Sequence, residues 1–374
     1  MYQKEIKVGN ENKLFRYIFN TEHSFSIPEL AKANDMSFPT VKRVINKFLE
    51  KEIIYEWTLS SGGVGRRAVE YKYNCEFCYS LGVRINEEKI RTLLTDAKGN
   101  KIIYKSYDYN SDSGDILVVL IDALKSFISE LDLKYSSKII GIGISIPGIY
   151  NKESAFLEFT LSRRHPASSL QQIENELSLP VWVENEANMS ILAEAIIGNH
   201  KNLTDFTVIN ISNNVTCSTF HKFGTTSDEY FFKASRVHHM IIDYEQQKKV
   251  GDCISYKVLI EKIKKIFPEI ESLKGFFGNS KIFNSREGQE IIKEFLRYMG
   301  IILKNLLYTY NPRKLIICGE IANYEEFLLN DILNIVYEEN HNFYRGRETI
   351  HFSKFKGDSS IIGAAIFPIV DKLM

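Results

Sequence analysis

The spacing of apolar residues along the first fifty positions is helical. In residues 12–48 they recur three and four positions apart, as on one face of a helix, and three short helices are predicted. The second is expected over Ile27–Ala33, because Ser26 and Glu29 have the spacing of a capping box. Ser37 is expected to cap the third helix. The apolar stripe of that third helix consists of Val41, Val44, Ile45, Phe48 and Leu49.

After Glu50 the apolar period shortens to about two residues, which is typical of strands. The runs Ile53–Thr58 and Ala68–Tyr73 are predicted to pair as a hairpin around the glycine-rich turn Ser60–Arg67. Three helices followed by a hairpin predict a winged helix-turn-helix over residues 1–74. In such a domain the third helix enters the major groove of DNA, and the hairpin tip reaches an adjacent minor groove.

Beyond Asn74 strand-like and helical stretches alternate, which is typical of an α/β fold. A strand meander followed by alternating helices and strands occurs twice, so two lobes with a ligand-sized cleft between them are predicted. We assign residues 75–188 together with 359–374 to the first lobe and residues 189–358 to the second. The strands are expected at 79–85, 89–95, 102–107, 139–146, 181–183, 207–211, 217–221 and 315–318, and the main helices at 114–131, from 186, 255–267, 287–308, 324–338 and 360–372.

The charge balance restricts where DNA could bind. The 374 residues contain 47 Lys and Arg and 47 Asp and Glu, so a basic coat over the whole protein is excluded. Residues 1–74, however, carry 12 basic and 9 acidic residues, a net charge of +3, and phosphate neutralisation by this head would supply most of the affinity. The candidate DNA-binding residues are Ser37, Phe38, Pro39, Thr40, Lys42, Arg43, Lys47, Arg66 and Arg67.

The remaining composition indicates a protein of the cytoplasm. Five cysteines are too few for a secreted disulfide framework, and no signal-peptide or membrane-spanning stretch is found. Cys75 and Cys78 have metal-ligand spacing but no second pair, and a buried pair of thiols is the favoured interpretation.

Several short segments, in this order and spacing, resemble the ROK family (repressor, open reading frame, kinase), and within it the sugar-responsive regulators of the xylose-repressor type. The resemblance implies a two-lobed, actin-like ATPase fold of the ribonuclease H-like kind behind the winged helix. It also implies a homodimer or tetramer, with dimer contacts on the second lobe, that binds operator DNA and reads a sugar or sugar phosphate in the cleft. The segments are Ser26–Ala31, Thr40–Val41, Gly63–Arg67, Ile142–Gly148, Leu179–Asn188, His239–Met240, Ile316–Gly319 and Ile362–Ala365.

The chain departs from the family where kinases bind ATP and zinc. The two glycine-rich phosphate loops correspond to Val83–Glu88 and Ile211–Thr216, which lack the glycines that let a backbone approach phosphate. The family's catalytic Asp corresponds to Glu186, and its zinc-binding run to Glu245–Cys253, with one cysteine left. We therefore predict no kinase activity, no catalytic residue, no cofactor and no metal.

The sugar-binding residues are changed as well. The candidate effector-binding residues are Gly148, Asn185, Glu186, Arg236, His238 and His239. Of these, the resemblance supplies Asn185, Glu186 and His239, and Arg236 and His238 are proposed as anion contacts. Arg236 takes the place of an acidic residue, and Ser255 stands where a last Glu would be. One hypothesis is an anionic effector, a sugar phosphate or acidic sugar, to which Arg163, Arg164 and His165 would also contribute. The alternative is a cleft that no longer senses a ligand. His238 and His239, as strand neighbours, are expected to point to opposite faces and not to share a metal.

The predicted function is a DNA-binding transcriptional regulator, expected to be a repressor, of carbohydrate-metabolism genes. Two other classes remain open. One is a sugar kinase with an appended DNA-binding domain, which ATP-dependent phosphorylation of a hexose would establish. The other is a regulator whose α/β part only dimerises the DNA-binding heads, which a DNA affinity unchanged by all metabolites would favour.

Overall fold

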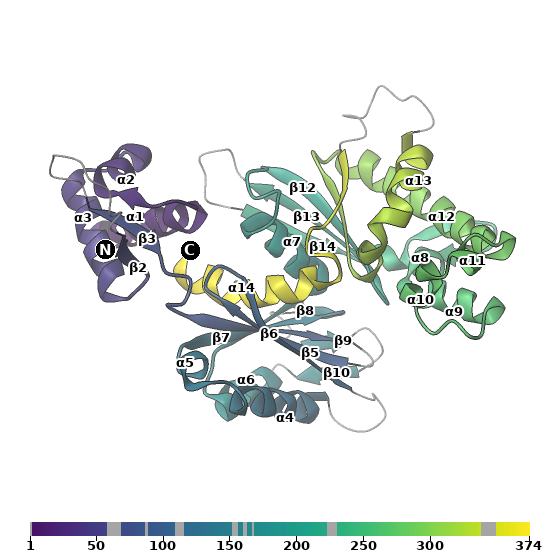
Figure 1. The fold of residues 1–374 in the computed structure, drawn as a ribbon, viewed down its shortest axis with the longest axis horizontal. Helices are drawn as coiled ribbons and strands as arrows, with labels where there is room; N and C mark the ends of the chain where they lie inside the picture. The colour runs from purple at the N-terminus through teal and green to yellow at the C-terminus, as the bar shows by residue number, and fades with distance from the viewer. Residues whose placement is uncertain are drawn as a thin grey trace.

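The computed structural model describes residues 2–57, 69–86, 89–108, 116–151, 156–159, 163–166, 168–222, 230–337 and 349–374. It has a helical head, two α/β lobes and a long C-terminal helix between them (Figure 1). This confirms the predicted fold class. Among the described residues, no helix is both long and apolar enough to cross a bilayer.

The head contains the three predicted helices and both strands of the hairpin. Its small sheet has the order β1-β3-β2, and all its pairs are antiparallel. Ser26 and Glu29 form the predicted capping box. The hairpin tip, with Arg66 and Arg67, lies outside the described residues. The elements are α1 (Tyr2–Asn20), β1 (Phe25–Ser26), α2 (Ile27–Asn34), α3 (Phe38–Glu50), β2 (Ile54–Trp57) and β3 (Glu70–Tyr73).

The first lobe is a five-stranded sheet of order β11-β7-β4-β5-β6. Strands β4, β5 and β6 form the predicted antiparallel meander, and β7 and β11 add to it in parallel. Helix α4 packs its apolar residues against one face of this sheet, in one core with β4 and β7. The elements are β4 (Tyr79–Ile85), β5 (Lys89–Asp96), β6 (Lys101–Asp108), α4 (Ile116–Ser129), α5 (Leu133–Ser136), β7 (Ile139–Ile146), α6 (Ser168–Leu177) and β11 (Val181–Asn185). Three short strands, β8 (Ile149–Asn151), β9 (Phe156–Phe159) and β10 (Arg163–Pro166), form a separate antiparallel sheet.

The second lobe is a five-stranded sheet of order β14-β13-β12-β17-β18. A helical layer that includes α9, α12 and α13 covers one face and shares the largest apolar core with it. The strands are β12 (Asp205–Ile211), β13 (Val215–Lys222), β14 (Tyr230–Ser235), β15 (Ile241–Asp243), β16 (Lys248–Lys249), β17 (Leu315–Cys318) and β18 (Ile350–Phe352). The helices are η1 (Val237–His239), α8 (Gly251–Ile254), α9 (Tyr256–Ile266), α10 (Leu273–Gly278), α11 (Ser280–Phe283), α12 (Arg286–Tyr310), η2 (Glu320–Tyr324), α13 (Glu325–Tyr337) and η4 (Lys356–Asp358).

Two helices, α7 (Glu186–Ile196) and α14 (Ser359–Leu373), lie between the two sheets (Figure 1). Both are buried on almost every side, as expected of a helix enclosed by other elements. Glycine makes this close packing possible. A Cβ atom on Gly143 would lie 1.9 Å from the carbonyl oxygen of Ala364, and one on Gly363 would lie 1.7 Å from that of Met189.

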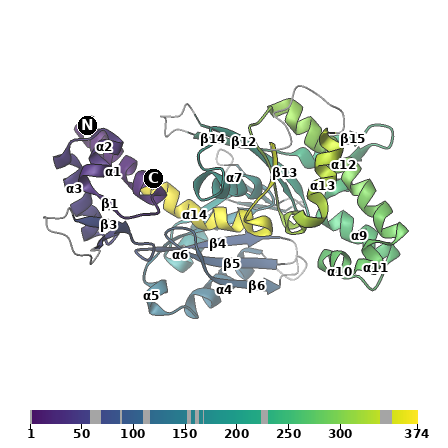
Figure 2. The same cartoon turned by 45° about the horizontal axis from the view of Figure 1, so that its top comes forward.

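The far end of α14 reaches the head. Ile369 and Val370 belong to the same apolar core as Leu14 and Phe15 of α1. Arg16 also donates a hydrogen bond from Nη2 to the carbonyl oxygen of Met374, at 2.6 Å. Figure 2 shows the helix running from the head to the region between the sheets. The head is thus attached to the body through packed side chains as well as through the chain connection.

Candidate functional site

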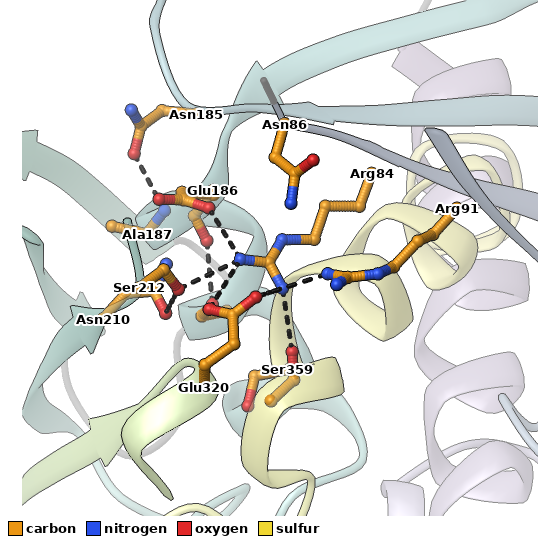
Figure 3. Close-up of polar contacts among 12 residues, drawn as sticks. Arg84, Asn86, Arg91, Asn185, Glu186, Ala187, Asn210, Ser212, Glu320 and Ser359 are labelled. Carbon is orange, nitrogen blue, oxygen red and sulfur yellow. Dashed lines mark hydrogen bonds and ion pairs between the residues drawn. The ribbon is translucent and has the colours of Figure 1, made fainter. Parts of the chain in front are cut away.

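Charged residues at the end of β4, the start of α7 and the start of η2 lie close together between the two lobes. Arg84 lies near the end of β4, Glu186 is the first residue of α7, and Glu320 is the first residue of η2. Ser212, directly after β12, completes the group, as Figure 3 shows. We call these four residues the arginine clasp. Strand β4 belongs to the first sheet, whereas β12 and η2 belong to the second lobe, so the clasp bridges the lobes.

The guanidinium of Arg84 is almost fully hydrogen-bonded. Its Nη1 lies 2.9 Å from Oε1 of Glu320, and its Nη2 lies 3.1 Å from Oε2 of the same residue. The Nη2 also lies 3.0 Å from Oγ of Ser212 and 3.4 Å from Oε2 of Glu186. A further bond joins Nη1 to the carbonyl oxygen of Gly357, at 3.1 Å, just before α14. The two-point contact with Glu320 is the strong, directional form of an arginine–carboxylate pair.

Charge pairing sets the protonation of the clasp. Burial alone would lower the pKa of Arg84, but Glu320 and Glu186 raise it above its ordinary value. Burial also opposes ionisation of Glu320, yet Arg84 and hydrogen bonds from Arg84 and Ser212 lower its pKa to about 2. The pKa of Glu186 is raised, because burial outweighs its single longer contact with Arg84. Its Oε1 has no hydrogen-bond partner among the described residues.

Little open space remains beside the clasp. The remaining cavity has a volume of about 10 Å³ and is lined by Arg84, Asn86, Pro147, Glu186, Ser212, Asn213, Asn214 and Glu320. That is room for about one water, whereas ligand pockets usually enclose several hundred Å³. A molecule larger than water could enter this space only if the lining side chains moved.

Asn185 is held by bonds within the protein. Its Nδ2 donates to the carbonyl oxygen of Gly148 at 2.7 Å, and its Oδ1 accepts from the backbone N–H of Ala187 at 2.8 Å, which caps α7. The structure therefore places three predicted effector residues, Gly148, Asn185 and Glu186, side by side. The side chains of Asn185 and Glu186 form hydrogen bonds with other residues of the protein.

The expectation that His238 and His239 point to opposite faces of a strand is wrong. They lie in the 3₁₀ helix η1, where the chain turns, and their rings meet edge to face with centroids 5.2 Å apart. Nδ1 of His238 accepts from the backbone N–H of Val215 at 3.4 Å. Burial, followed by the neighbouring His239, lowers the pKa of His238, so the neutral ring is favoured. Arg236 and His239 are exposed.

The region that corresponds to the family's metal site has its own internal contacts. A Cβ atom on Gly251 would lie 2.0 Å from the ring of His238, so the two are closely packed. Cys253 is buried, and the hydroxyl of Ser255 accepts from the backbone N–H of Val258 to cap α9. Among the residues that the structure describes, no three His, Cys, Asp or Glu side chains lie where they could share a metal ion. For Arg163, Arg164 and His165 the structure describes the backbone of β10 alone.

The predicted recognition helix presents a mixed polar and apolar face. Phe38 is 49% exposed, and Pro39, Lys42 and Arg43 are exposed too. Ser37 caps the helix by accepting from the backbone N–H of Thr40 at 3.4 Å, and the two hydroxyls lie 2.8 Å apart. Lys47, further along the helix, forms a partly exposed ion pair with Glu11 of α1.

Sequence reasoning missed the roles of Arg84, Ser212 and Glu320. One signal was present: Arg84 is a charged residue within the apolar strand Tyr79–Ile85, and a buried charge needs a partner. The partner itself could not be inferred, since Glu320 is 236 positions away.

Comparisons with known proteins agree with this architecture. Residues 80–216 match the ROK family. The xylose repressor of Bacillus subtilis is 24% identical over 358 residues, covering 91% of each chain. A crystal structure of a ROK family transcriptional regulator, described as a homolog of the E. coli MLC protein, superimposes with a TM-score of 0.77 at 18% identity over 98% of both chains. A ROK glucokinase from Streptomyces griseus has a TM-score of 0.63 at 17% identity, covering 77% of this chain and 98% of its own.

Proposed function

Because residues 80–216 match the ROK family and the B. subtilis xylose repressor is similar over most of the chain, we propose that this protein is a sugar-responsive, DNA-binding transcriptional regulator that acts as a repressor in the cytoplasm. The observation that carries the proposal is α3, whose N-terminal part presents Phe38, Lys42 and Arg43 to solvent. The start of a recognition helix is where side chains reach base edges in the major groove. Arg66 and Arg67 of the hairpin turn would add phosphate contacts beside it.

We propose further that the cleft is not a kinase active site. ATP needs backbone N–H groups that approach its phosphates, and both loops lack the glycines that allow this approach. The cleft is also occupied by Arg84, and the carboxylate of Glu186 faces that guanidinium. Purified protein incubated with ATP, Mg²⁺ and a panel of hexoses should give no phosphorylated sugar. A sugar phosphate formed at a rate proportional to protein concentration would establish the kinase alternative.

An effector would act by opening the arginine clasp. Arg84 is bonded to Gly357, directly before α14, and the other end of α14 packs on the head. A ligand that displaced the guanidinium from Glu186 would therefore disturb the start of the helix that supports the DNA-binding domain. In a homodimer this movement would change the spacing of the two heads on two half-sites, by a shift of population between two arrangements.

The second lobe supplies a surface suited to the dimer. Met240, Ile241 and Tyr244 of the β15–β16 hairpin are large apolar residues with exposed fractions of 42%, 51% and 81%. Grouped apolar residues at a surface are typical of protein contacts.

Cleft specificity is tested by calorimetry with neutral, phosphorylated and acidic sugars. Heat from the neutral sugars alone would reject an anionic cleft effector, and the Arg236→Ala variant tests that residue's part in binding an anion.

The test of DNA binding uses the promoter region of the protein's own gene. In a fluorescence-anisotropy titration, Arg43→Ala should weaken binding by about fivefold or more if Arg43 contacts a base, since a good arginine–guanine pair contributes about 1–3 kcal/mol. Arg66→Ala should reduce the slope of log affinity against log salt by about one. Lys274→Ala, an exposed lysine at α10, is the control. Parental affinity in both head variants would reject the proposed DNA-binding surface.

A further inference from the structure

A large cavity lies where the head meets both lobes, away from the arginine clasp. Its volume is about 640 Å³, which is within the range of small-molecule sites. The head contributes the end of α1, the first lobe contributes the β5–β6 turn, and the rest comes from the segment after α7 and from residues just before η4. The lining includes Phe19, Asn20, Lys98, Lys201, Lys354 and Phe355.

Three of the four charged residues in the lining are lysines. Lys98 is half-buried, donates to the carbonyl oxygen of Phe19 and lies 4.7 Å from the centre of the Phe19 ring. Lys201 and Lys354 are exposed, and neither takes part in an ion pair within the described part of the chain. Glu22 is the one carboxylate in the described lining. Burial is the main cause that lowers the pKa of Lys98, and the positive charge of Lys201 lowers it further.

We propose that this cavity is a second small-molecule site, for a phosphorylated, hydroxyl-bearing ligand such as a sugar phosphate. Lys201 and Lys354 bind the phosphate, since ammonium groups form charge-assisted hydrogen bonds with its oxygens. The amide side chains of Asn20, Asn199 and Asn202, which also line the cavity, bind hydroxyl groups. None of these residues belongs to the clasp or to η1.

The position of the cavity gives the ligand a regulatory effect. A molecule bound there contacts α1 of the head and both lobes at once. It therefore favours whichever arrangement of head and body keeps those surfaces together, and its affinity is linked to the affinity for DNA. This linkage does not depend on whether the cleft itself responds to a sugar.

The first experiment is a calorimetric titration of the full-length protein with pyrophosphate, which tests the cationic part of the site. Binding should be saturable and should weaken by tenfold or more in the double variant Lys201→Ala/Lys354→Ala, because each lysine supplies a charge-assisted contact. The matched control Lys274→Ala/Lys281→Ala, in two exposed lysines of the second lobe, should bind as the parent does. Absence of saturable binding, or equal weakening in the control, would overturn the proposal.

Further arms separate this site from the cleft and from DNA. Arg236→Ala should leave pyrophosphate binding unchanged. If this variant lost pyrophosphate binding, the anion would bind in the cleft and not in the second cavity. A hexose bisphosphate should bind more tightly than pyrophosphate, and equal or weaker binding would reject the hydroxyl contacts. In the absence of phosphate compounds the lysine double variant should retain parental affinity for DNA. A tenfold loss there would assign these lysines to the DNA surface and overturn the proposal.

Discussion

Removing one charge from the arginine clasp should destabilise the protein measurably. In Glu320→Gln the shape of the side chain is kept, but the two-point ion pair with Arg84 becomes a neutral contact. The pKa of Glu320 falls from its ordinary 4.5 to about 2. Since one pH unit corresponds to about 1.4 kcal/mol, the ionised carboxylate contributes on the order of 3 kcal/mol to the free energy of unfolding at neutral pH.

The sign of the pH dependence follows from the direction of this shift. A carboxylate whose pKa is lower in the folded state stabilises the protein above the pKa of the unfolded chain. That stabilisation is lost as the pH falls from about 4.5 toward about 2. The difference in unfolding free energy between the parent and Glu320→Gln should therefore be constant near neutral pH and narrow below pH 4.5.

Urea unfolding of both proteins between pH 7 and pH 2.5 measures this difference. The control is Glu294→Gln, which breaks the partly exposed ion pair with Lys262. It should cost less than about 1 kcal/mol, because solvent screens such pairs. If Glu320→Gln cost no more than this control, or if its cost did not change between pH 5 and pH 2.5, the clasp would not be the buried, charge-balanced network described above.

Two further predictions concern packing and thiol reactivity. Gly143→Ala should destabilise the protein by more than about 2 kcal/mol in urea unfolding, since the added Cβ would lie 1.9 Å from the Ala364 carbonyl oxygen, whereas Gly9→Ala, with no atom within 4 Å, should not destabilise it. With an aromatic disulfide reagent at pH 7.5, Cys75 should be the first thiol to react, because it is half-buried and the other four are buried. Burial raises the pKa of Cys78 and Cys217 to about 12. Rapid release of more than one equivalent of aromatic thiolate from the folded protein would therefore contradict the prediction that Cys75 reacts first.

Local patterns predicted the elements that local interactions determine. The capping box at Ser26 and the apolar stripe of α3 depend on residues a few positions apart, and both are found. The first helix is longer than predicted, because α1 begins at Tyr2, ten residues before Asn12, where the helical spacing was predicted to begin. The strands β8 to β10 were not predicted, since runs of three or four residues give too little periodicity.

The candidate site was less predictable because its contacts are long-range. Asn185 and Glu186 were predicted to face a ligand, and the structure shows them bonded to Gly148 and Arg84. The sequence indicates that Arg84 stands near a lost phosphate loop. It does not indicate that the carboxylate of Glu320, from the other lobe, pairs with Arg84.

The contacts of the arginine clasp support the proposal that the cleft does not bind ATP. Two guanidinium groups, Arg84 and Arg91, contact Glu320, and Arg84 also contacts Glu186, so two positive and two negative charges balance within the protein. A triphosphate that bound Arg84 would have to separate it from both carboxylates, and this would leave the buried Glu186 without its ion pair. Breaking a buried ion pair in this way is strongly destabilising. A neutral sugar would need to displace the same contacts but would bring no additional negative charge. On electrostatic grounds we therefore expect the cleft to exclude nucleotides more strongly than neutral sugars.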